Sequence, residues 1–498
     1  MLSKSKFITG QQCHKSLWLS IKGFEPTNPP DESAMDRLKA GDQVGEVAKK
    51  LFPHGREIEY LGSDFQKMCD LTKKAIDAGE TTLYEASFIE KDVFIRVDIM
   101  NKTSKGWDIY EVKSSSSLRS YHKEDASLQW HILQSVKGLK LNHAFVVTLN
   151  NKYLKDGDIN PAELFTKHLL TEYVKSNQLE IQNQLSDIKF VSTSNDEPEI
   201  SIGAQCKKPH ACEYHDRCWP KSSKETNSVF NLYRLNLDKK LDFYNQGIIS
   251  FEQIKHDTKL SSTQQNQIKA NEIKKPIINK SKIQTFIDSV EYPISYFDFE
   301  TFTDAVPIFD NQRPHMQIPF QYSLHIQKDN KSNIDVDTGH FEFIASIKED
   351  PRRAIAESIL QNIPENGSIM AYNQSFEKNV IKSLADYCPD ISEELLALND
   401  RFIDLIDPFR GGGYYHHEFK GSFSIKKVLP AICPNNEKLD YKNLEINDGA
   451  MASSAYKNMR NSTEDERTSI RKRLFDYCAL DTYAMYAIYS KLLEIVKT

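Results

Sequence analysis

Two carboxylates lie within a short aromatic segment, residues 292–302, whose sequence is YPISYFDFETF. In a β-strand alternate side chains point to opposite faces, so Asp298 and Glu300 share one face while the phenylalanines beside them share the other. Two carboxylates that project together from a buried strand cost free energy unless a cation neutralises them. The segment therefore predicts a buried strand with a cation site on one face.

Further acids follow in the same half of the chain. A strand expected at residues 368–372 leads into a helix that holds Glu377 in its first turn. A long amphipathic helix is expected at residues 464–496, where Tyr477 and Asp481 are four residues apart and share a face. Four acids and a tyrosine suit two hard divalent cations, Mg²⁺ or Mn²⁺, held about 3.5–4 Å apart as in phosphoryl transfer.

The segments FDFET, YNQSFEKNVI and YCALD resemble, in this order, the three motifs of the DEDD exonucleases, a superfamily with an RNase H-like fold. The Tyr-x-x-x-Asp spacing is similar to that of the tyrosine branch. The resemblance implies a mixed sheet flanked by helices and cleavage from the 3′ end of a strand. It also implies that Tyr477 orients the attacking water and that the metal ligands are Asp298, Glu300, Glu377 and Asp481. The second-motif acid of the family is usually Asp, so Glu377 departs from the pattern by one methylene.

Each motif by itself has an ordinary interpretation. An Asp-x-Glu pair is common on exposed strands, and Tyr477 and Asp481 could belong to an ordinary helix face. Asp404 and Asp407 are further acids for which a turn or strand-end role is favoured. For the glycine run at residues 411–413, a flexible loop is favoured over a phosphate contact.

A second set of charged residues lies on strands predicted in the N-terminal half. Period-two alternation predicts strands at residues 82–90, 93–101 and 107–113, a hairpin turn at residues 90–92, helices at residues 46–52 and 125–139, and a strand at residues 143–149. Glu111 and Lys113 share a face, where Asp98 could meet them. Asp98 and Glu111 would bind Mg²⁺, while Lys113 could stabilise a hydroxide or the charge that develops on a phosphorane.

This order of helix, three strands and helix, with an Asp followed by Glu-x-Lys, resembles the PD-(D/E)xK nucleases and specifically the RecB-like group. The resemblance implies a restriction-endonuclease-like core. It also implies accessory roles for Glu46 as a metal ligand and for Gln129 as a catalytic residue, with Glu85 as a weaker candidate. The alternative for Glu111 and Lys113 is a structural ion pair between strand residues.

Four of the eight cysteines are distributed in an unusual way. Cys206, Cys212 and Cys218 follow one another at six-residue steps, and Cys13 lies far upstream. Three close thiolates and a distant one can enclose a 4Fe-4S cluster, since four cysteines ligate such clusters. The pattern resembles the iron–sulfur staple of RecB-like nucleases from CRISPR adaptation and of AddB-type helicase–nucleases, where the first spacing is often shorter.

Zinc is the alternative for the cysteine site, because His14, His210 and His215 lie nearby in sequence and could substitute for thiolates. The remaining four cysteines have no partners by spacing, so we expect them to be small buried hydrophobic residues.

The acidic total is uneven along the chain. The 498 residues carry 64 Lys+Arg and 70 Asp+Glu, a net charge of −6, whereas residues 219–282 hold twelve basic and six acidic side chains. Phosphate contact requires local cationic surface rather than a basic total, so this segment could supply it, although a solvated helical linker is favoured. No segment has the roughly 18 uncharged apolar residues of a membrane span, and no apolar signal core opens the sequence, so a cytoplasmic location is expected.

The sequence therefore predicts an α/β (α+β) protein in three parts. Residues 1–219 form the RecB-like domain with the four cysteines, residues 220–290 a basic helical connector, and residues 291–498 the RNase H-like DEDD domain. The same pairing resembles a bacterial family whose C-terminal half is a DEDD relative. The expected activity is metal-dependent hydrolysis of nucleic acid, with single-stranded DNA favoured over RNA and with a helicase or a repair or defence complex as partner. RNA processing and an inert nucleic-acid-binding scaffold are the alternatives.

Overall fold

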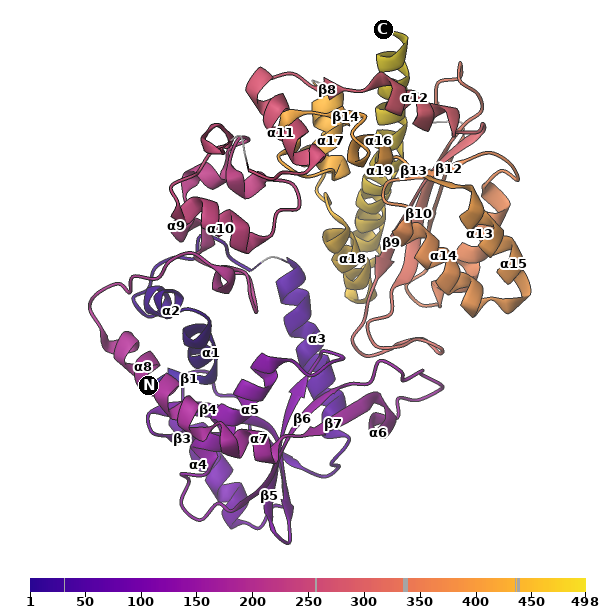
Figure 1. Cartoon of the computed structure of the whole chain (residues 1–498). Helices are drawn as coiled ribbons and strands as arrows, with labels where there is room; N and C mark the ends of the chain where they lie inside the picture. The colour runs from indigo at the N-terminus through magenta and orange to yellow at the C-terminus, as the bar shows by residue number, and fades with distance from the viewer. Residues whose placement is uncertain (31, 256–257, 335–338, 435, 437–438) are drawn as a thin grey trace. The chain divides into compact units, whose positions relative to one another are not determined.

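Two compact units make up the chain in a computed structural model, which describes all residues except 31, 256–257, 335–338, 435 and 437–438 (Figure 1). The first unit contains Met1–Trp219 and Asp304–Met316, and the second contains Pro220–Thr303 and Gln317–Thr498. Residues 220–290, interpreted from the sequence as a connector, belong to the second unit. The predicted α/β (α+β) class is confirmed, since both units combine helices with a mixed sheet.

The described residues of the first unit form a seven-stranded sheet. Its main path runs in the order β2 (Arg56–Glu57), β3 (Thr82–Glu90), β4 (Val93–Thr103), β5 (Gly106–Lys113), β6 (Leu141–Leu149) and β7 (Phe165–Leu169). A short N-terminal strand, β1 (Leu2–Ser3), pairs in parallel with the start of β4. β4 is antiparallel to β3 and β5, whereas β5 and β6 are parallel. The four strands predicted for this region are confirmed, with ends that differ by at most two residues.

The predicted hairpin turn between β3 and β4 is also confirmed. Lys91 and Asp92 both have positive φ values, 51° and 56°, as a two-residue turn between twisted strands requires. On the other side of β4, Ile99 pairs with Tyr110, so the next position along both strands brings Asp98 toward Glu111. The hairpins thus place two of the candidate acids on adjacent strands.

Helices complete the first unit, and most of them contact its sheet. They are α1 (Lys4–Gln12), α2 (His14–Ile21), α3 (Glu32–Lys49), α4 (Phe65–Asp77), α5 (Ser120–Leu133), α6 (Pro161–Leu164), α7 (Thr171–Ser176), α8 (Gln178–Thr193) and α9 (His215–Cys218). The helix expected at residues 125–139 is α5, which starts earlier than predicted. It also ends earlier than predicted, because residues 134–138 form turns. The helix expected at residues 46–52 is the last turn of α3, which ends at Lys49.

The second unit is built around a five-stranded sheet in the part of the chain that the structure describes. The strand order is β11 (His340–Ile344), β10 (Ile318–Gln327), β9 (Ile294–Phe302), β12 (Ile369–Ala371) and β13 (Phe402–Asp404). β9 pairs antiparallel with β10 and parallel with β12. The predicted strand with the two carboxylates is therefore an interior strand of this sheet.

The two faces of this sheet differ in chemistry. Phe297, Phe299, Tyr322 and Leu324 enter one apolar core with α13 (Pro351–Asn362), α14 (Ser375–Tyr387) and α15 (Ser392–Leu398). The opposite face carries Asp298 and Glu300 and is covered by α19 (Glu464–Lys497), as Figure 1 shows. The long C-terminal helix and the helix that holds Glu377 are confirmed at their predicted positions. Helices on both faces bury the strand and its acids.

Smaller elements complete the second unit. They are α10 (Leu237–Asn245), α11 (Ser262–Ile273), β8 (Ile277–Ile278), α12 (Lys280–Asp288), α16 (Asp407–Arg410), β14 (Tyr414–Tyr415), α17 (Ile425–Ile432) and α18 (Gly449–Asn458). β8 and β14 form a separate two-stranded sheet. Within the described residues, no helix has the length and apolar character that crossing a membrane requires.

Candidate functional site

Three acids meet on the face of the sheet that α19 covers: Glu300 and Asp481 are buried, and Asp298 is partly buried. Strand β9 supplies Asp298 and Glu300, and α19 supplies Asp481 from one turn beyond Tyr477. The three side chains each offer a carboxylate oxygen, and these oxygens all lie within 4.8 Å of one another. In the described part of the chain, this is the one group of His, Cys, Asp and Glu side chains that meets this criterion. Such a spacing lets one cation contact all three carboxylates.

The carboxyl groups of these three acids have raised pKa values and so keep their protons to a higher pH than free carboxyl groups do. Burial, together with repulsion from Asp481, raises the pKa of Asp298 and of Glu300 well above the ordinary range. Burial also raises the pKa of Asp481 to about 6, although a hydrogen bond from Tyr441 and the charge of Lys426 favour its ionised form. A divalent cation would remove this penalty by neutralising the carboxylates, so the donor set fits Mg²⁺ or Mn²⁺.

Glu377 lies beside this group but outside the 4.8 Å set. Its charge contributes to the raised pKa of Asp298 and Glu300, so it faces the same region. The side chain is buried, and burial with repulsion from Asp404 raises its pKa to about 8. Among the described residues its Oε2 atom has no hydrogen-bond partner. A buried carboxylate oxygen without a partner is consistent with a ligand that reaches this position.

Two tyrosines contact the acid group, and sequence reasoning identified only one of them. Tyr477 is buried and lies near Asp481, as its place one turn earlier on α19 predicts. Tyr441 was missed, yet its hydroxyl donates a short hydrogen bond to Asp481 Oδ1. Burial and the nearby Asp481 raise the pKa of both phenols, so both remain hydrogen-bond donors.

A lysine that no sequence motif identified, Lys426, also lies beside the acid group. The ammonium of Lys426, on α17, lies 5.5 Å from the ring centroid of Tyr441 and 5.8 Å from that of Tyr477. Its Nζ donates a hydrogen bond of 2.5 Å to the carbonyl of Asn447. Its charge also lowers the pKa of Glu300 and Asp481 against the effect of burial. It is thus a cation at the edge of the acid group.

The turn role favoured for Asp404 is confirmed. Its carboxylate accepts hydrogen bonds from the backbone N–H groups of Asn373 (2.8 Å), Gln374 (3.2 Å) and Ile406 (3.2 Å). These bonds fix the loop that leads from β12 into α14, where Glu377 begins its helical turn. Asp404 therefore positions the backbone near Glu377 and has its oxygens occupied.

A second cluster of charges forms at the expected place in the first unit. Asp98 Oδ2 accepts a hydrogen bond of 2.6 Å from the backbone N–H of Val112, between Glu111 and Lys113. The Lys113 ammonium lies 2.6 Å from Glu111 Oε1. Burial, with repulsion from Glu111, raises the pKa of Asp98 to about 8. The predicted residues are therefore brought together, and Glu111 and Lys113 form the ion pair that was considered as their alternative role.

Two members of this cluster were not predicted. Lys4 Nζ, at the start of α1, lies 2.6 Å from Glu111 Oε1 and 3.4 Å from Asp125 Oδ1. Asp125, on α5, also forms a short ion pair with Lys113. Burial disfavours ionisation of Glu111, but Lys113 and Lys4 outweigh it and lower its pKa. A lysine at the N-terminus and an acid within a helix give no motif, so spacing alone does not reveal them.

The accessory residues divide into those inside and outside this cluster. Gln129, on α5, donates a short hydrogen bond from Nε2 to Glu111 Oε2 and is fully buried. Glu85 pairs with Arg96 at 3.2 Å. Glu46 is 69% exposed and forms an ion pair of 2.6 Å with Lys49. Because residues three apart on a helix are neighbours, this local pair holds Glu46 on the surface of α3 instead of at the expected metal site.

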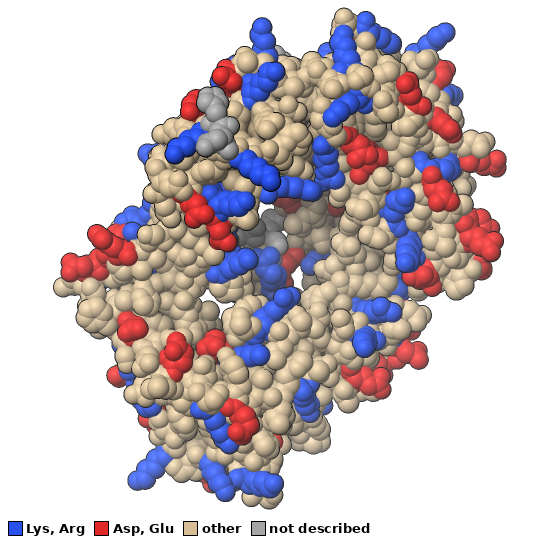
Figure 2. Space-filling view, viewed as in Figure 1, with Lys and Arg blue, Asp and Glu red and all other residues tan. Residues whose placement is uncertain are grey.

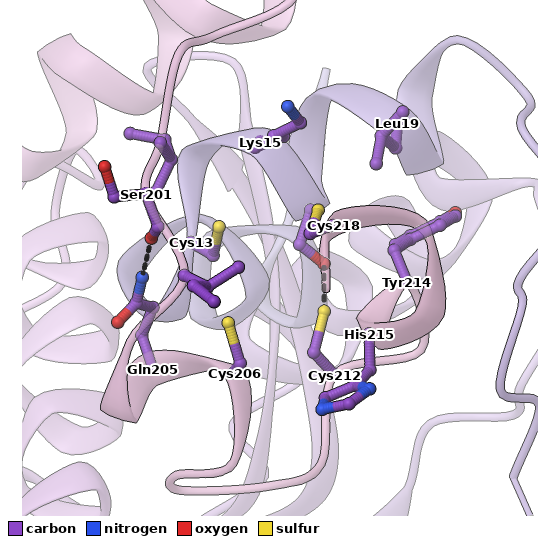
Figure 3. Close-up of a pocket in the computed structure, with 13 residues that line it drawn as sticks. Cys13, Lys15, Leu19, Ser201, Gln205, Cys206, Cys212, Tyr214, His215 and Cys218 are labelled. Atoms are coloured by element: carbon purple, nitrogen blue, oxygen red, sulfur yellow. Dashed lines mark hydrogen bonds between the residues drawn. The ribbon is translucent and has the colours of Figure 1, made fainter. Parts of the chain in front are cut away.

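The four predicted cysteines line one pocket of the first unit (Figure 3). Cys13 precedes α2, Cys206 ends a short 3-10 helix (Ala204–Cys206), Cys212 lies in the following loop, and Cys218 ends α9. All four are free thiols, and the Cys212 sulfur lies 3.8 Å from Ser16 Oγ. Burial raises the pKa of Cys13 and Cys218, and neighbouring thiols raise it further. Thiols that oppose one another's ionisation are typical of a metal-free cysteine site.

The spacing of the sulfur atoms bears on which group they could hold. A single zinc ion with Zn–S distances of about 2.3 Å would bring the sulfurs to about 3.8 Å from one another. In the described chain no three of these cysteines have sulfur atoms within 4.8 Å of each other. The four thiols therefore line a common pocket without the close grouping that one zinc ion would impose.

Two lysines of the basic segment contact backbone carbonyls of the second unit. On the side of the molecule shown in Figure 2, Lys and Arg side chains alternate with Asp and Glu side chains over the surface. Within the segment, Lys240 Nζ donates to the Phe230 carbonyl and Lys282 Nζ to the Gly411 carbonyl, both at 2.8 Å. Part of its positive charge is therefore used in contacts within the second unit.

Comparisons with known proteins place part of this site in a conserved family model. Residues 295–424 match a domain of unknown function, DUF2779. The matched segment contains Asp298, Glu300 and Glu377, and it ends before Tyr477 and Asp481. The acids of β9 and α14 thus lie in the matched segment, and those of α19 lie beyond it.

Three curated proteins from mollicutes are similar to parts of the chain. The uncharacterized protein MG366 of Mycoplasma genitalium is 30% identical over 217 residues, which are 41% of this chain and 32% of that protein. Its homolog in Mycoplasma pneumoniae is 26% identical over 285 residues, 53% of this chain and 42% of the relative. The uncharacterized protein UU173 of Ureaplasma parvum is 29% identical over 220 residues, 39% of this chain and 30% of the relative. The similarity therefore covers less than half of each relative.

Proposed function

We propose that the chain is a cytoplasmic, metal-dependent nuclease that hydrolyses phosphodiester bonds, with the acid group of β9 and α19 as its main active site. The observation that carries this proposal is the meeting of Asp298, Glu300 and Asp481, whose carboxylate oxygens lie within 4.8 Å of one another, with Glu300 and Asp481 buried and Asp298 partly buried. Acids that repel one another in such a place cost free energy without a cation. Their order along the chain is that of the DEDD motifs.

Asp298, Glu300 and Asp481 would hold Mg²⁺ or Mn²⁺, which when bound activates water and stabilises negative charge on the phosphate. Glu377 offers a buried oxygen without a partner, so it is available to a second cation or to the attacking water. Tyr477 lies one turn before Asp481 on α19, and its hydroxyl would orient that water. Lys426 supplies positive charge at the edge of the site, where it can attract the phosphate backbone.

The cluster around Glu111 supports a second nuclease site of the PD-(D/E)xK kind. Asp98 and Glu111 lie on adjacent strands, and Lys113 contacts Glu111 at 2.6 Å, which is the set that the resemblance requires. The Lys113 ammonium could stabilise charge that develops on a phosphate. Gln129 holds the second oxygen of Glu111 and so fixes the orientation of that carboxylate.

The four cysteines would hold a 4Fe-4S cluster, which when bound links the start of α2 to the segment at residues 206–218. Four cysteine ligands and no histidine among the proposed donors support this group, and zinc is the alternative. DNA is the proposed substrate, because RecB-like nucleases act mainly on DNA, and a helicase or repair complex is the proposed partner. RNA remains the alternative substrate because tyrosine-branch DEDD enzymes include RNases.

The proposal is tested with single-stranded DNA and RNA oligonucleotides of matched sequence, labelled at either end and incubated with Mg²⁺ or Mn²⁺. We expect wild-type protein to shorten the strand from its 3′ end. Asp298→Ala should remove this activity, whereas Lys113→Ala, in the other unit, should retain it. Wild-type protein that hydrolyses neither DNA nor RNA would contradict the proposed function.

A further inference from the structure

The first residues of the chain place the ammonium group of Lys4 in the N-terminal charge cluster, which contains Asp98, Glu111, Lys113 and Asp125. β1 pairs in parallel with β4, the strand that carries Asp98, through Leu2 with Val93 and Ser3 with Phe94. The Ser3 hydroxyl caps α1 by accepting from the N–H of Lys6 at 3.3 Å. Lys4 therefore begins a capped helix at a fixed place beside the sheet. Its ammonium lies 2.6 Å from Glu111 Oε1 and 3.4 Å from Asp125 Oδ1.

The two lysines cover the acids from solvent. The side chains of Glu111 and Asp125 are 3% and 2% exposed, whereas those of Lys4 and Lys113 are each 22% exposed. Glu111 Oε1 accepts from both ammonium groups, and Oε2 accepts from Gln129. Every oxygen of Glu111 is thus occupied by a group of this chain. Two positive charges balance two acids without any added ion.

Lys4 and Lys113 differ in how easily each ammonium group can move away from Glu111. Lys113 follows Glu111 by two residues on the same strand, so the strand itself holds them together. Lys4 comes from a different element, and its contact depends on a flexible four-carbon side chain. Rotation of that side chain toward solvent would expose Asp125 Oδ1 and leave Glu111 Oε1 with Lys113 as its one ammonium partner, without moving the sheet. Lys4 is therefore the group that a divalent cation would replace.

We propose that Lys4 is an internal counter-cation that competes with a divalent metal ion for Glu111 and Asp125. This inference rests on the proposed N-terminal nuclease site. It adds that Lys4 lowers the affinity of that site for a metal ion. A divalent cation binds there when the Lys4 ammonium withdraws. Asp125 thereby becomes a metal-facing acid of this site, beside Asp98 and Glu111.

The test measures Mn²⁺ binding by the decrease of the free-ion electron paramagnetic resonance signal. All proteins are full-length, have their cysteine site loaded, and carry Asp298→Asn and Asp481→Asn, so that the C-terminal acid group no longer dominates binding. Lys4→Met should tighten Mn²⁺ binding by about tenfold, because it removes one positive charge next to the carboxylates. Lys6→Met is the matched control on the same helix, since Lys6 lies outside the cluster, and it should leave binding unchanged. Lys4→Arg, which keeps the charge, should bind Mn²⁺ about as weakly as the parent.

Unchanged or weaker Mn²⁺ binding in Lys4→Met, or absence of binding in every variant, would overturn the inference. Weaker oligonucleotide binding with unchanged Mn²⁺ affinity would instead identify Lys4 as a phosphate contact and would also overturn it. If Lys4→Met fails to fold by circular dichroism, Lys4→Gln and the Lys4→Arg comparison carry the same decision. Because the C-terminal acids are already replaced, this titration is independent of whether their site hydrolyses nucleic acid.

Discussion

The Thr482 hydroxyl lies 2.8 Å from the Ser323 hydroxyl and joins helix α19 to strand β10. Ser323 stands directly opposite Asp298 in the β9–β10 pair, and Thr482 follows Asp481 on α19. The same Thr482 oxygen lies 2.8 Å from His325 Nδ1. These two contacts of Thr482 attach α19 to β10 next to Asp481 and opposite Asp298.

Thr482→Val tests this contact, because valine keeps the shape and removes the hydroxyl. We expect the free energy of unfolding to fall by about 1–3 kcal/mol, since buried Ser323 and His325 lose a partner. Urea unfolding measures this change. Thr468→Val, at an exposed position of the same helix, is the control and should change stability little. Equal stability of both variants would show that the contact does not hold α19.

Stability of the metal-free protein should depend on pH through the C-terminal acid group. The folded-state pKa is about 6 for Asp481 and about 8 for Glu377, above their ordinary values of 3.8 and 4.5. The folded state therefore binds more protons than the unfolded state between pH 3.8 and about 6 through Asp481, and between pH 4.5 and about 8 through Glu377. The free energy of unfolding falls as the pH rises through these two ranges. Below pH 3.8 both states are protonated, and this effect is absent.

Asp298→Asn removes one of the repelling charges, so in EDTA the variant should gain stability over wild type as the pH rises from about 4 to about 8. Urea unfolding at several pH values measures the difference. Asp288→Asn, at the exposed end of α12, is the control and should show a difference independent of pH. A gain in stability at low pH that disappears at high pH would contradict the account.

Tyr441→Phe removes one hydrogen bond to the ionised form of Asp481. In the metal-free protein the pKa of Asp481 should rise above its value of about 6, so protons compete more strongly with Mg²⁺. At limiting Mg²⁺ the acidic limb of the pH–rate profile should therefore move upward by about one pH unit. Hydrolysis measured across that range checks the shift. Tyr486→Phe, at a position on α19 where the hydroxyl contacts Asn333, should leave the profile unchanged. The same profile in Tyr441→Phe and wild type would exclude this role of Tyr441.

Cys206→Ser should remove the group held by the four cysteines, because Cys206 lines their pocket. Protein purified without oxygen should be brown, with absorbance near about 400 nm from iron–sulfur charge transfer, and the variant should lose that colour. Cys433→Ser, in the second unit, is the control and should keep it. Colourless wild-type protein with stoichiometric zinc would contradict the cluster.

The strands could be predicted because their signal is local. The alternation in residues 82–90 gives both ends of β3, and the aromatic segment around Asp298 predicts β9 from its neighbours alone. The first and third C-terminal motifs contain the three acids that meet, whereas Glu377 of the second motif lies outside that set. The limits of α5 were predicted less well, since its apolar pattern continues into the turns after Leu133.

The missed residues share a different cause. Lys4 reaches Glu111 only because β1 pairs with β4, and a two-residue strand carries no periodicity. Tyr441 and Lys426 lie outside any regular motif and approach Asp481 through tertiary packing. Glu46 was expected at the metal site from its place before the strands, but the helix face that it occupies is exposed. Contacts between distant elements depend on packing that local patterns do not contain.

Release of nucleotides from a 3′-labelled single-stranded oligonucleotide, by wild-type protein and by Asp298→Asn in the presence of Mg²⁺ or of EDTA, tests the central claim most directly. The account predicts release by wild-type protein with Mg²⁺, and loss of that release both in EDTA and in the variant. Asp288→Asn, which leaves the acid group intact, should retain the activity. Release that persists in EDTA or in Asp298→Asn, or no release from DNA or RNA by wild-type protein, would contradict the claim that these acids form a metal-dependent nuclease site.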